Sequence, residues 1–253
     1  MKIAVSGKGG VGKTTISAGL TKFFLNKGYK VFAVDADPDV SLGTILGIDD
    51  NSVEGLKPIV EMREVISKKC GGDGAFFPLD PQVDDILEDY IIQKGNLFFL
   101  KMGAVKQGGS SCYCRENTIL NALVNSLLIK HKEIVLLDMG AGIEHLTRGT
   151  SGGVDIMLIV TEASKVSVNT ALIVKKLAQE LGVQHINFIG NKIRTEKEKV
   201  FLKSALPAHE ILGFVEFNEE VLDLAMEFHP LDKSSAASLD LEAIGSEILA
   251  RNS

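Results

Sequence analysis

The sequence lacks any long apolar run, and this absence argues against a protein with membrane-spanning helices. No stretch approaches the ~20 apolar residues that a helix needs to span a bilayer. The chain runs from Met1 directly into the strand-like "KIAVSG", which leaves no room for a secretory signal peptide. We therefore expect a soluble, cytoplasmic protein that does not act at a membrane.

Basic residues and cysteines are also scarce. The chain has 27 Lys and Arg against 33 Asp and Glu, a net charge of −6, and no basic run that would follow a phosphate backbone. Nucleic acid is therefore not the expected partner. Only 3 cysteines are present, and in a reducing compartment they argue against a disulfide framework.

Short apolar runs alternate with helical patterns over most of the 253 residues, of which 45% are hydrophobic. The runs are rich in Val, Ile, Leu and Phe and are continuous, which is typical of strands covered on both faces. Strand–helix repetition predicts a mostly parallel sheet. The predicted strands are 2–7, 30–36, 96–102, 133–139, 155–162, 186–191 and, more weakly, 210–215.

The intervening segments have helical patterns, and the chain shows neither an internal repeat nor a linker. We predict one α/β domain over 1–253, a P-loop NTPase with a twisted sheet of about seven to eight strands and helices on both faces. The region 67–95 reads as a loop. The predicted helices are 13–27, 53–68, 115–131, 165–181, 195–204, 218–228 and 238–250.

The stretch "GKGGVGKTT" at 7–15 follows the first predicted strand and opens a helix. It completes the phosphate-binding pattern GxxxxGK[ST], in which glycines let backbone N–H groups surround the phosphates. Lys13 is expected to neutralise the β and γ phosphates, and the Thr14 hydroxyl to ligate Mg²⁺. The predicted ATP- or ADP-binding residues on this loop are Gly9, Gly10, Val11, Gly12, Lys13, Thr14 and Thr15.

Aspartates follow two of the predicted strands. Asp35, Asp37 and Asp39 end the strand in "VFAVDADPD", and Asp138 ends another in "IVLLDMGAG". The carboxyl ends of parallel strands meet at one edge of the sheet, so these side chains should lie near the phosphates. We expect Asp138 to reach Mg²⁺ through water and Asp37 to orient the attacking water.

The lysine directly after the first glycine is not required by the phosphate-loop pattern. In having it, the loop resembles the deviant Walker A motif of the MinD/ParA class of P-loop ATPases. "VDADPD", "DMGAGIE" and "GNK" at 190–192 resemble the switch I, switch II and adenine-recognition segments of that class, in the same order. The resemblance implies that Lys8 reaches across a homodimer to the other subunit's phosphates, and that Asn191 contacts the adenine edge.

A lysine supplied in trans makes physical sense. Hydrolysis builds negative charge on the transferred phosphoryl group, and a cation from a second subunit would stabilise that charge as an arginine finger does. Hydrolysis would then wait for dimerisation. The alternative is that Lys8 only adds positive potential within its own subunit.

Cys112 and Cys114 lie in a polar loop, 110–115, immediately before a predicted helix. A helix N-terminus lowers the pKa of a thiol and favours the metal-binding thiolate. One C-x-C pair supplies two ligands, whereas a closed site needs four, so two pairs meeting across a twofold axis are the economical solution. Thiolates suit Zn²⁺, Cu(I), Ni²⁺ or an iron–sulfur cluster.

With "FPLDPQVDDI" upstream and "GIEHL" after the second switch, this C-x-C placement resembles the CooC-type ATPases. Those proteins assist nickel insertion into carbon monoxide dehydrogenase, and a relative serving acetyl-CoA synthase would look similar. The resemblance implies a nucleotide-driven homodimer, without membrane or nucleic-acid partners, that holds one Ni²⁺ or Zn²⁺ between its subunits. Cys70 and His145 receive no role.

Two other functions stay open. One is an iron–sulfur scaffold or electron carrier that uses the same four thiolates. The other is a MinD/ParA-like positioning switch. It is disfavoured because the terminal segment "SLDLEAIGSEILARNS" has Arg251 as its only cation and so lacks the basic face of a membrane-binding helix.

Overall fold

Eight strands form one sheet in a computed structural model that describes residues 1–37, 41–59, 90–102, 132–140, 154–221 and 236–251. Their order across the sheet is β3-β4-β2-β5-β1-β6-β7-β8, and every described pairing is parallel except β3 with β4. The strands are β1 Lys2–Gly7, β2 Lys30–Ala36, β3 Ile92–Lys94, β4 Leu97–Lys101, β5 Glu133–Met139, β6 Ile156–Thr161, β7 His185–Ile193 and β8 Ile211–Glu216.

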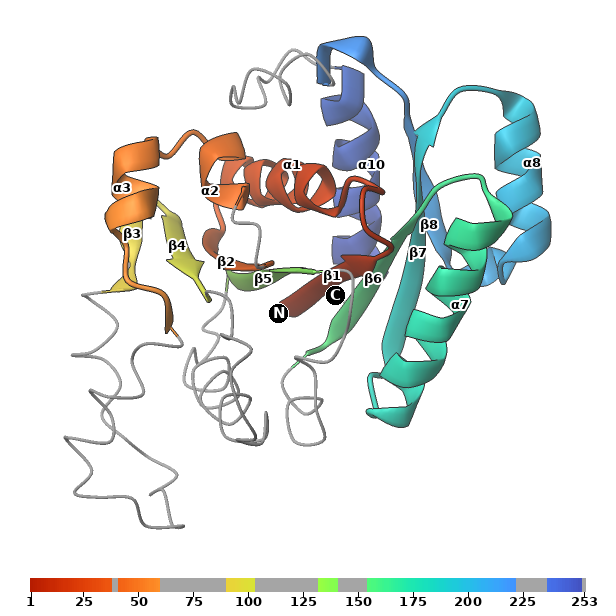
Figure 1. Cartoon of the computed structure of the whole chain (residues 1–253), viewed down its shortest axis with the longest axis horizontal. Coiled ribbons are helices and arrows are strands. Elements are labelled where there is room, and N and C mark those ends of the chain that lie inside the picture. The colour runs from red at the N-terminus through yellow and green to blue at the C-terminus, as the bar shows by residue number, and fades with distance from the viewer. Residues whose placement is uncertain (38–40, 60–89, 103–131, 141–153, 222–235, 252–253) are drawn as a thin grey trace, which may run out of the picture.

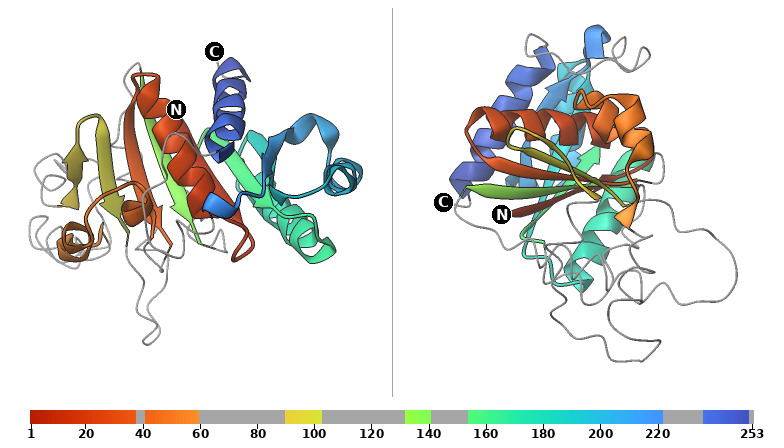
Figure 2. Two further views of the ribbon diagram at one scale, coloured as in Figure 1. Left: turned by 90° about the horizontal axis from the view of Figure 1, so that it is seen from above. Right: turned by 90° about the vertical axis from the view of Figure 1, so that its left-hand side faces the viewer.

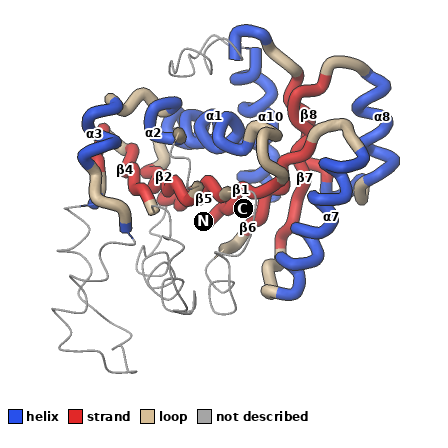
Figure 3. The backbone as a smooth tube through the Cα atoms, viewed as in Figure 1, coloured by secondary structure: helices blue, strands red, loops and turns tan. Residues whose placement is uncertain are grey.

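Helices cover both faces of this sheet (Figure 1; Figure 2 gives two further views). α1 and α10 lie on one face and α7 and α8 on the other, so that helical layers flank the strands in Figure 3. The described helices are α1 Lys13–Asn26, α2 Leu42–Ile45, α3 Asp50–Gly55, α7 Lys165–Glu180, α8 Glu196–Ala205 and α10 Ala236–Arg251, with a 3₁₀ turn at Ala208–Glu210.

Both faces of the central strand β1 are buried, which explains why polar and apolar residues do not alternate in its sequence. Ile3 and Val5 pack into the core beneath α1 and α10, whereas Ala4 faces the core beneath α7 and α8. All three side chains are fully buried. A strand covered on both faces needs apolar residues at successive positions, and this is the pattern from which the strand was predicted.

The predicted parallel fold is confirmed, and β1, β2 and β5 have the bounds expected from the sequence. The loop predicted over 67–95 is wrong at its end, because β3 forms an antiparallel hairpin with β4. The two-residue connection is Gly95–Asn96, and Gly95 has a φ of 60° that glycine adopts without steric cost.

Of the helix predicted over 53–68, the described part is confirmed at 53–55 and wrong at 56–59. α3 starts earlier, where Asp49 accepts a hydrogen bond from the Ser52 N–H, and it ends at Gly55. Leu56 already has an extended backbone, and Pro58 would prevent the helix from continuing. The predicted helix 115–131, and the greater part of that over 218–228, lie outside the described residues. In the described part of the chain, no helix combines the length and apolarity required to cross a bilayer.

Candidate functional site

The phosphate-loop sequence connects β1 to α1 at the carboxyl edge of the sheet. Gly10 and Gly12 have φ values of 80° and 89°, in the left-handed region that disfavours side chains, and Gly12 caps the N-terminus of α1. A side chain at Gly12 would also overlap the amide of Asn191, whereas one at Gly9 or Gly10 would meet open space. The loop thus has the backbone that lets N–H groups gather around an anion.

The two lysines of the loop lie in different environments. Lys13, at the first position of α1, is 6% exposed, and its Nζ donates to the Lys8 carbonyl oxygen at 3.4 Å. The Lys8 residue itself is exposed. One cation therefore lies against the loop, and the other is accessible to a second molecule. The loop and the start of α1 contain all the nucleotide-binding residues predicted around these lysines, namely Gly9, Gly10, Val11, Gly12, Lys13, Thr14 and Thr15.

Asp138 lies at the end of β5 and points to α1. Its Oδ1 accepts a hydrogen bond of 2.8 Å from the buried Ser17 hydroxyl, while its buried Oδ2 has no partner among the described residues. Burial raises the pKa of Asp138 to about 6, against the opposing effects of the neighbouring Thr14 and Ser17 hydroxyls and of the Lys13 charge. A buried carboxylate oxygen without a partner beside Thr14 fits a hydrated Mg²⁺ ion.

Asp35 is the neighbour of Asp138 in the strand register, at the end of β2. Its carboxylate accepts hydrogen bonds from the backbone N–H groups of Ser41 at 3.1 Å, Leu42 at 2.9 Å and Asp37 at 3.3 Å. Burial and, second, the nearby Asp138 together raise the pKa of Asp35 to about 7, although these hydrogen bonds oppose the shift. Asp35 therefore organises the turn into α2.

Asp37 is partly exposed at the same edge, and its role in orienting the attacking water stays a prediction. Asp39, like Cys70, Cys112, Cys114 and His145, lies outside the described residues. Within the described ranges, no group of three or more His, Cys, Asp or Glu side chains is arranged to hold a metal.

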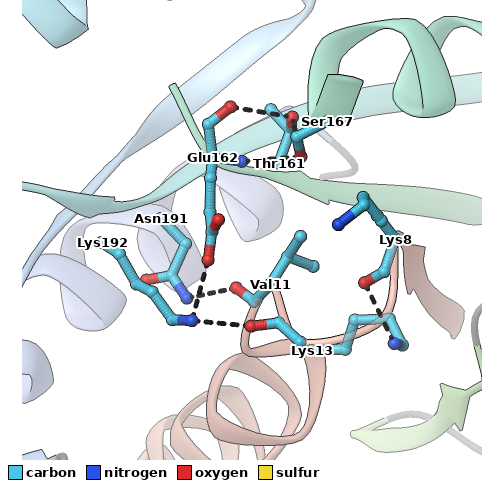
Figure 4. A network of polar contacts seen from close by, with 9 residues as sticks. Lys8, Val11, Lys13, Thr161, Glu162, Ser167, Asn191 and Lys192 are labelled. Carbon is cyan, nitrogen blue, oxygen red and sulfur yellow. Dashed lines mark hydrogen bonds and ion pairs between the residues drawn. The ribbon is translucent and has the colours of Figure 1, made fainter. Parts of the chain in front are cut away.

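Asn191 contacts the phosphate loop, and so does the residue after it (Figure 4). Asn191 is 5% exposed, and its Nδ2 donates to the Val11 carbonyl oxygen at 2.8 Å. Lys192 Nζ donates to the Gly10 carbonyl oxygen at 2.6 Å and forms an ion pair of 2.8 Å with Glu162, which follows β6. The predicted adenine-recognition segment thus lies directly against the loop.

Two residues of this site, Ser17 and Glu162, are absent from the predictions made from sequence, and Lys192 was included only as the last residue of the segment 190–192, without a role of its own. Ser17 carried a usable signal, because it lies one helical turn after Thr14 and so shares its face. The contacts of Glu162 and Lys192 depend on how β6 and β7 align with the loop, and no local pattern predicts those contacts.

Comparison with known families gives one match over most of the chain. Residues 2–231 match the model of the CobQ/CobB/MinD/ParA nucleotide-binding domain. The chain is 38% identical to an uncharacterised ATP-binding protein of Methanocaldococcus jannaschii over 98% of both proteins. It is also 38% identical to the carbon monoxide dehydrogenase accessory protein CooC of Rhodospirillum rubrum, over 87% of this chain and 85% of that protein.

Solved structures with similar folds include MinD proteins at low sequence identity. MinD from the Aquifex aeolicus MinC:MinD complex is 22% identical with a TM-score of 0.71, over 98% of this chain and 96% of that one. MinD of Pyrococcus horikoshii, solved with Mg-ADP, is 22% identical with a TM-score of 0.69, over 99% and 98%. At this identity, the likeness shows a shared fold.

Proposed function

The chain belongs to the CobQ/CobB/MinD/ParA nucleotide-binding family and is a CooC-type P-loop ATPase, and from this we propose that it assists nickel insertion into carbon monoxide dehydrogenase or a related nickel enzyme. The observation that carries the proposal is the 38% identity to a carbon monoxide dehydrogenase accessory protein over 87% of this chain. The protein works in the cytoplasm as a homodimer, and nickel is its cargo.

ATP binds at the loop between β1 and α1. Backbone N–H groups of Gly9 to Thr15 surround the phosphates, and Lys13 neutralises the β and γ oxygens. The Thr14 hydroxyl and the unpartnered Oδ2 of Asp138 would hold Mg²⁺, which would supply positive charge beside the phosphate oxygens. Ser17 keeps the other oxygen of Asp138 directed into α1.

Hydrolysis depends on residues from both subunits of the homodimer. Asp37 orients the attacking water from the end of β2. Lys8, exposed on the loop, contacts the phosphates bound by the partner subunit and stabilises the charge of the transition state. ATP turnover is therefore coupled to formation of the homodimer.

The cargo is held at the twofold axis. Cys112 and Cys114 of each subunit supply four thiolates to one Ni²⁺ ion, or to Zn²⁺ in its place. Asp37 and Asp138 lie at the ends of β2 and β5, where the chain enters the two segments that resemble switches. Loss of the γ-phosphate releases those segments, changes subunit packing and so changes the affinity for the metal.

Metal titration of the reduced protein tests the proposal, with subunit association followed by sedimentation in ADP, in ATP and without nucleotide. We expect one Ni²⁺ or Zn²⁺ per dimer, a nucleotide-dependent affinity, and loss of binding in Cys112→Ala/Cys114→Ala. Cys70→Ala removes a cysteine outside the pair and should bind metal normally. Unchanged metal binding in the double variant would contradict the proposal.

The same samples separate the two other functions. A brown protein with charge-transfer absorption that depends on Cys112 and Cys114 would indicate an iron–sulfur cluster instead of a nickel cargo. ATP-driven dimers that bind no thiol-dependent metal, but sediment with lipid vesicles or DNA, would indicate a positioning switch.

A further inference from the structure

Two adjacent residues at the end of β7 hold two adjacent carbonyl groups of the phosphate loop. Lys192 Nζ donates to the Gly10 carbonyl oxygen at 2.6 Å, and Asn191 Nδ2 donates to the Val11 carbonyl oxygen at 2.8 Å. These contacts join residues separated by 182 and 180 positions in the chain. Figure 4 shows both side chains reaching the loop from the same direction.

Peptide planarity gives these contacts a consequence for ligand binding. In a trans peptide, the C=O and the following N–H point in opposite directions. A donor that holds the Gly10 carbonyl therefore directs the Val11 N–H away from β7, and a donor on the Val11 carbonyl directs the Gly12 N–H likewise. Among the described residues, the Val11 N–H donates to the Lys8 carbonyl oxygen over a long distance of 3.4 Å, and a phosphate oxygen can replace this acceptor.

Lys192 has an unusual backbone conformation, and its side chain is held by two partners. Its backbone has a φ of 59°, a conformation that is costly for a residue with a side chain. Its ammonium pairs with Glu162 at 2.8 Å, and the backbone N–H of Glu162 in turn donates to Ser167 Oγ at 3.1 Å, near the start of α7. The ammonium is thus held between a carboxylate and the loop carbonyl, although 41% of the side chain is exposed.

We propose that Lys192 is a positioning residue for the nucleotide's phosphates: its ammonium, held by Glu162, fixes the Gly10 carbonyl and so aims the Val11 N–H into the phosphate site. Lys192 acts on the part of the nucleotide that all nucleoside diphosphates share, and does not read the base. This inference rests on nucleotide binding within the proposed function and is independent of the metal.

Nucleotide affinity of the full-length protein tests the inference. Lys192→Met removes the donor at similar length, and we expect its Kd for Mg·ADP to rise about tenfold or more, since a charge-assisted hydrogen bond is lost. Lys192→Arg keeps a cationic donor and should restore most of the affinity. Glu162→Gln should weaken binding by a smaller factor. Lys197→Met, which removes an exposed lysine from α8, is the matched control and should bind as the wild type does.

Inosine diphosphate distinguishes positioning from base recognition, because it carries the same phosphates and a different base edge. Lys192→Met should weaken both diphosphates by the same factor, with an unchanged thermal midpoint in the absence of ligand. A changed ratio of the two affinities would overturn the inference, as would ADP binding equal to that of the wild type. A wild-type protein that binds no ADP would instead remove the ATPase function itself.

Discussion

Asp35 should make the ligand-free protein less stable as the pH rises, and Asp35→Asn should remove this dependence. The carboxyl group is fully buried and next to Asp138, and its pKa is raised from 3.8 to about 7. Since the folded protein then holds a proton that the unfolded chain releases, this group contributes its full stability below about pH 4. That contribution is lost as the pH rises to about 7.

The expected change in the free energy of unfolding depends on the pH range over which unfolding is measured. Between pH 5 and pH 8, Asp35 of the folded protein loses its proton near pH 7, whereas the unfolded chain is already ionised at pH 5. The wild type therefore loses the equivalent of about two pKa units, or about 3 kcal/mol, over this range. The amide variant cannot ionise, and the change to the hydrogen bond that residue 35 accepts from the Asp37 N–H alters the stability by an amount that does not depend on pH.

Urea unfolding of both proteins at pH 5, 6, 7 and 8, without nucleotide, measures this difference. We expect Asp35→Asn to gain about 3 kcal/mol relative to the wild type between the ends of the range. Glu242→Gln removes a carboxylate from the exposed face of α10 and should follow the wild-type curve. If the stability difference between Asp35→Asn and the wild type is constant across the range, Asp35 is ionised throughout and the reasoning is refuted.

Other substitutions test the site directly. Ser17→Ala leaves Asp138 Oδ1 without its donor, and ATPase assays should show kcat reduced about tenfold with a smaller change in KM. Gly12→Ala places a side chain at a φ of 89° and against Asn191, so urea unfolding should show a loss of about 1–3 kcal/mol and calorimetry no ADP binding. Lys8→Ala should lower kcat about a thousandfold while ADP affinity changes little; an equal loss of affinity would show that Lys8 acts within its own subunit.

The parallel strands could be predicted because each is buried on both faces and leaves a continuous apolar run. β3 could not be predicted from such a run, since "IQK" is short and largely exposed, and its pairing is visible only in the Gly95–Asn96 turn. The helix prediction over 53–68 failed for a related reason. Val53, Leu56 and Ile59 have helix-like spacing and are buried, but only Val53 lies in the helix, and the chain reaches Leu56 and Ile59 after the helix has ended at Gly55.

In the candidate site, too, local features could be predicted from the sequence and contacts between distant residues could not. Residues of the phosphate loop are contiguous, so a local pattern identified them together with the element on each side. Ser17 and Asp138 are 121 residues apart, and Lys192 and Gly10 are 182 apart. These contacts exist only because the order of strands brings β5 and β7 to the loop, and no local pattern shows which residues pair.

The central position of β1 also has a consequence for how the protein is made. Among the described strands, β1 pairs with β5 and β6, so Val5 finds its partner Asp138 after more than half of the 253 residues have been synthesised. Asn191 and Lys192 emerge from the ribosome later still. Folding that depends on such distant pairing has a high contact order and is slow. The phosphate loop is translated before β5 and β7, and it therefore gains its binding conformation only after those strands have been made.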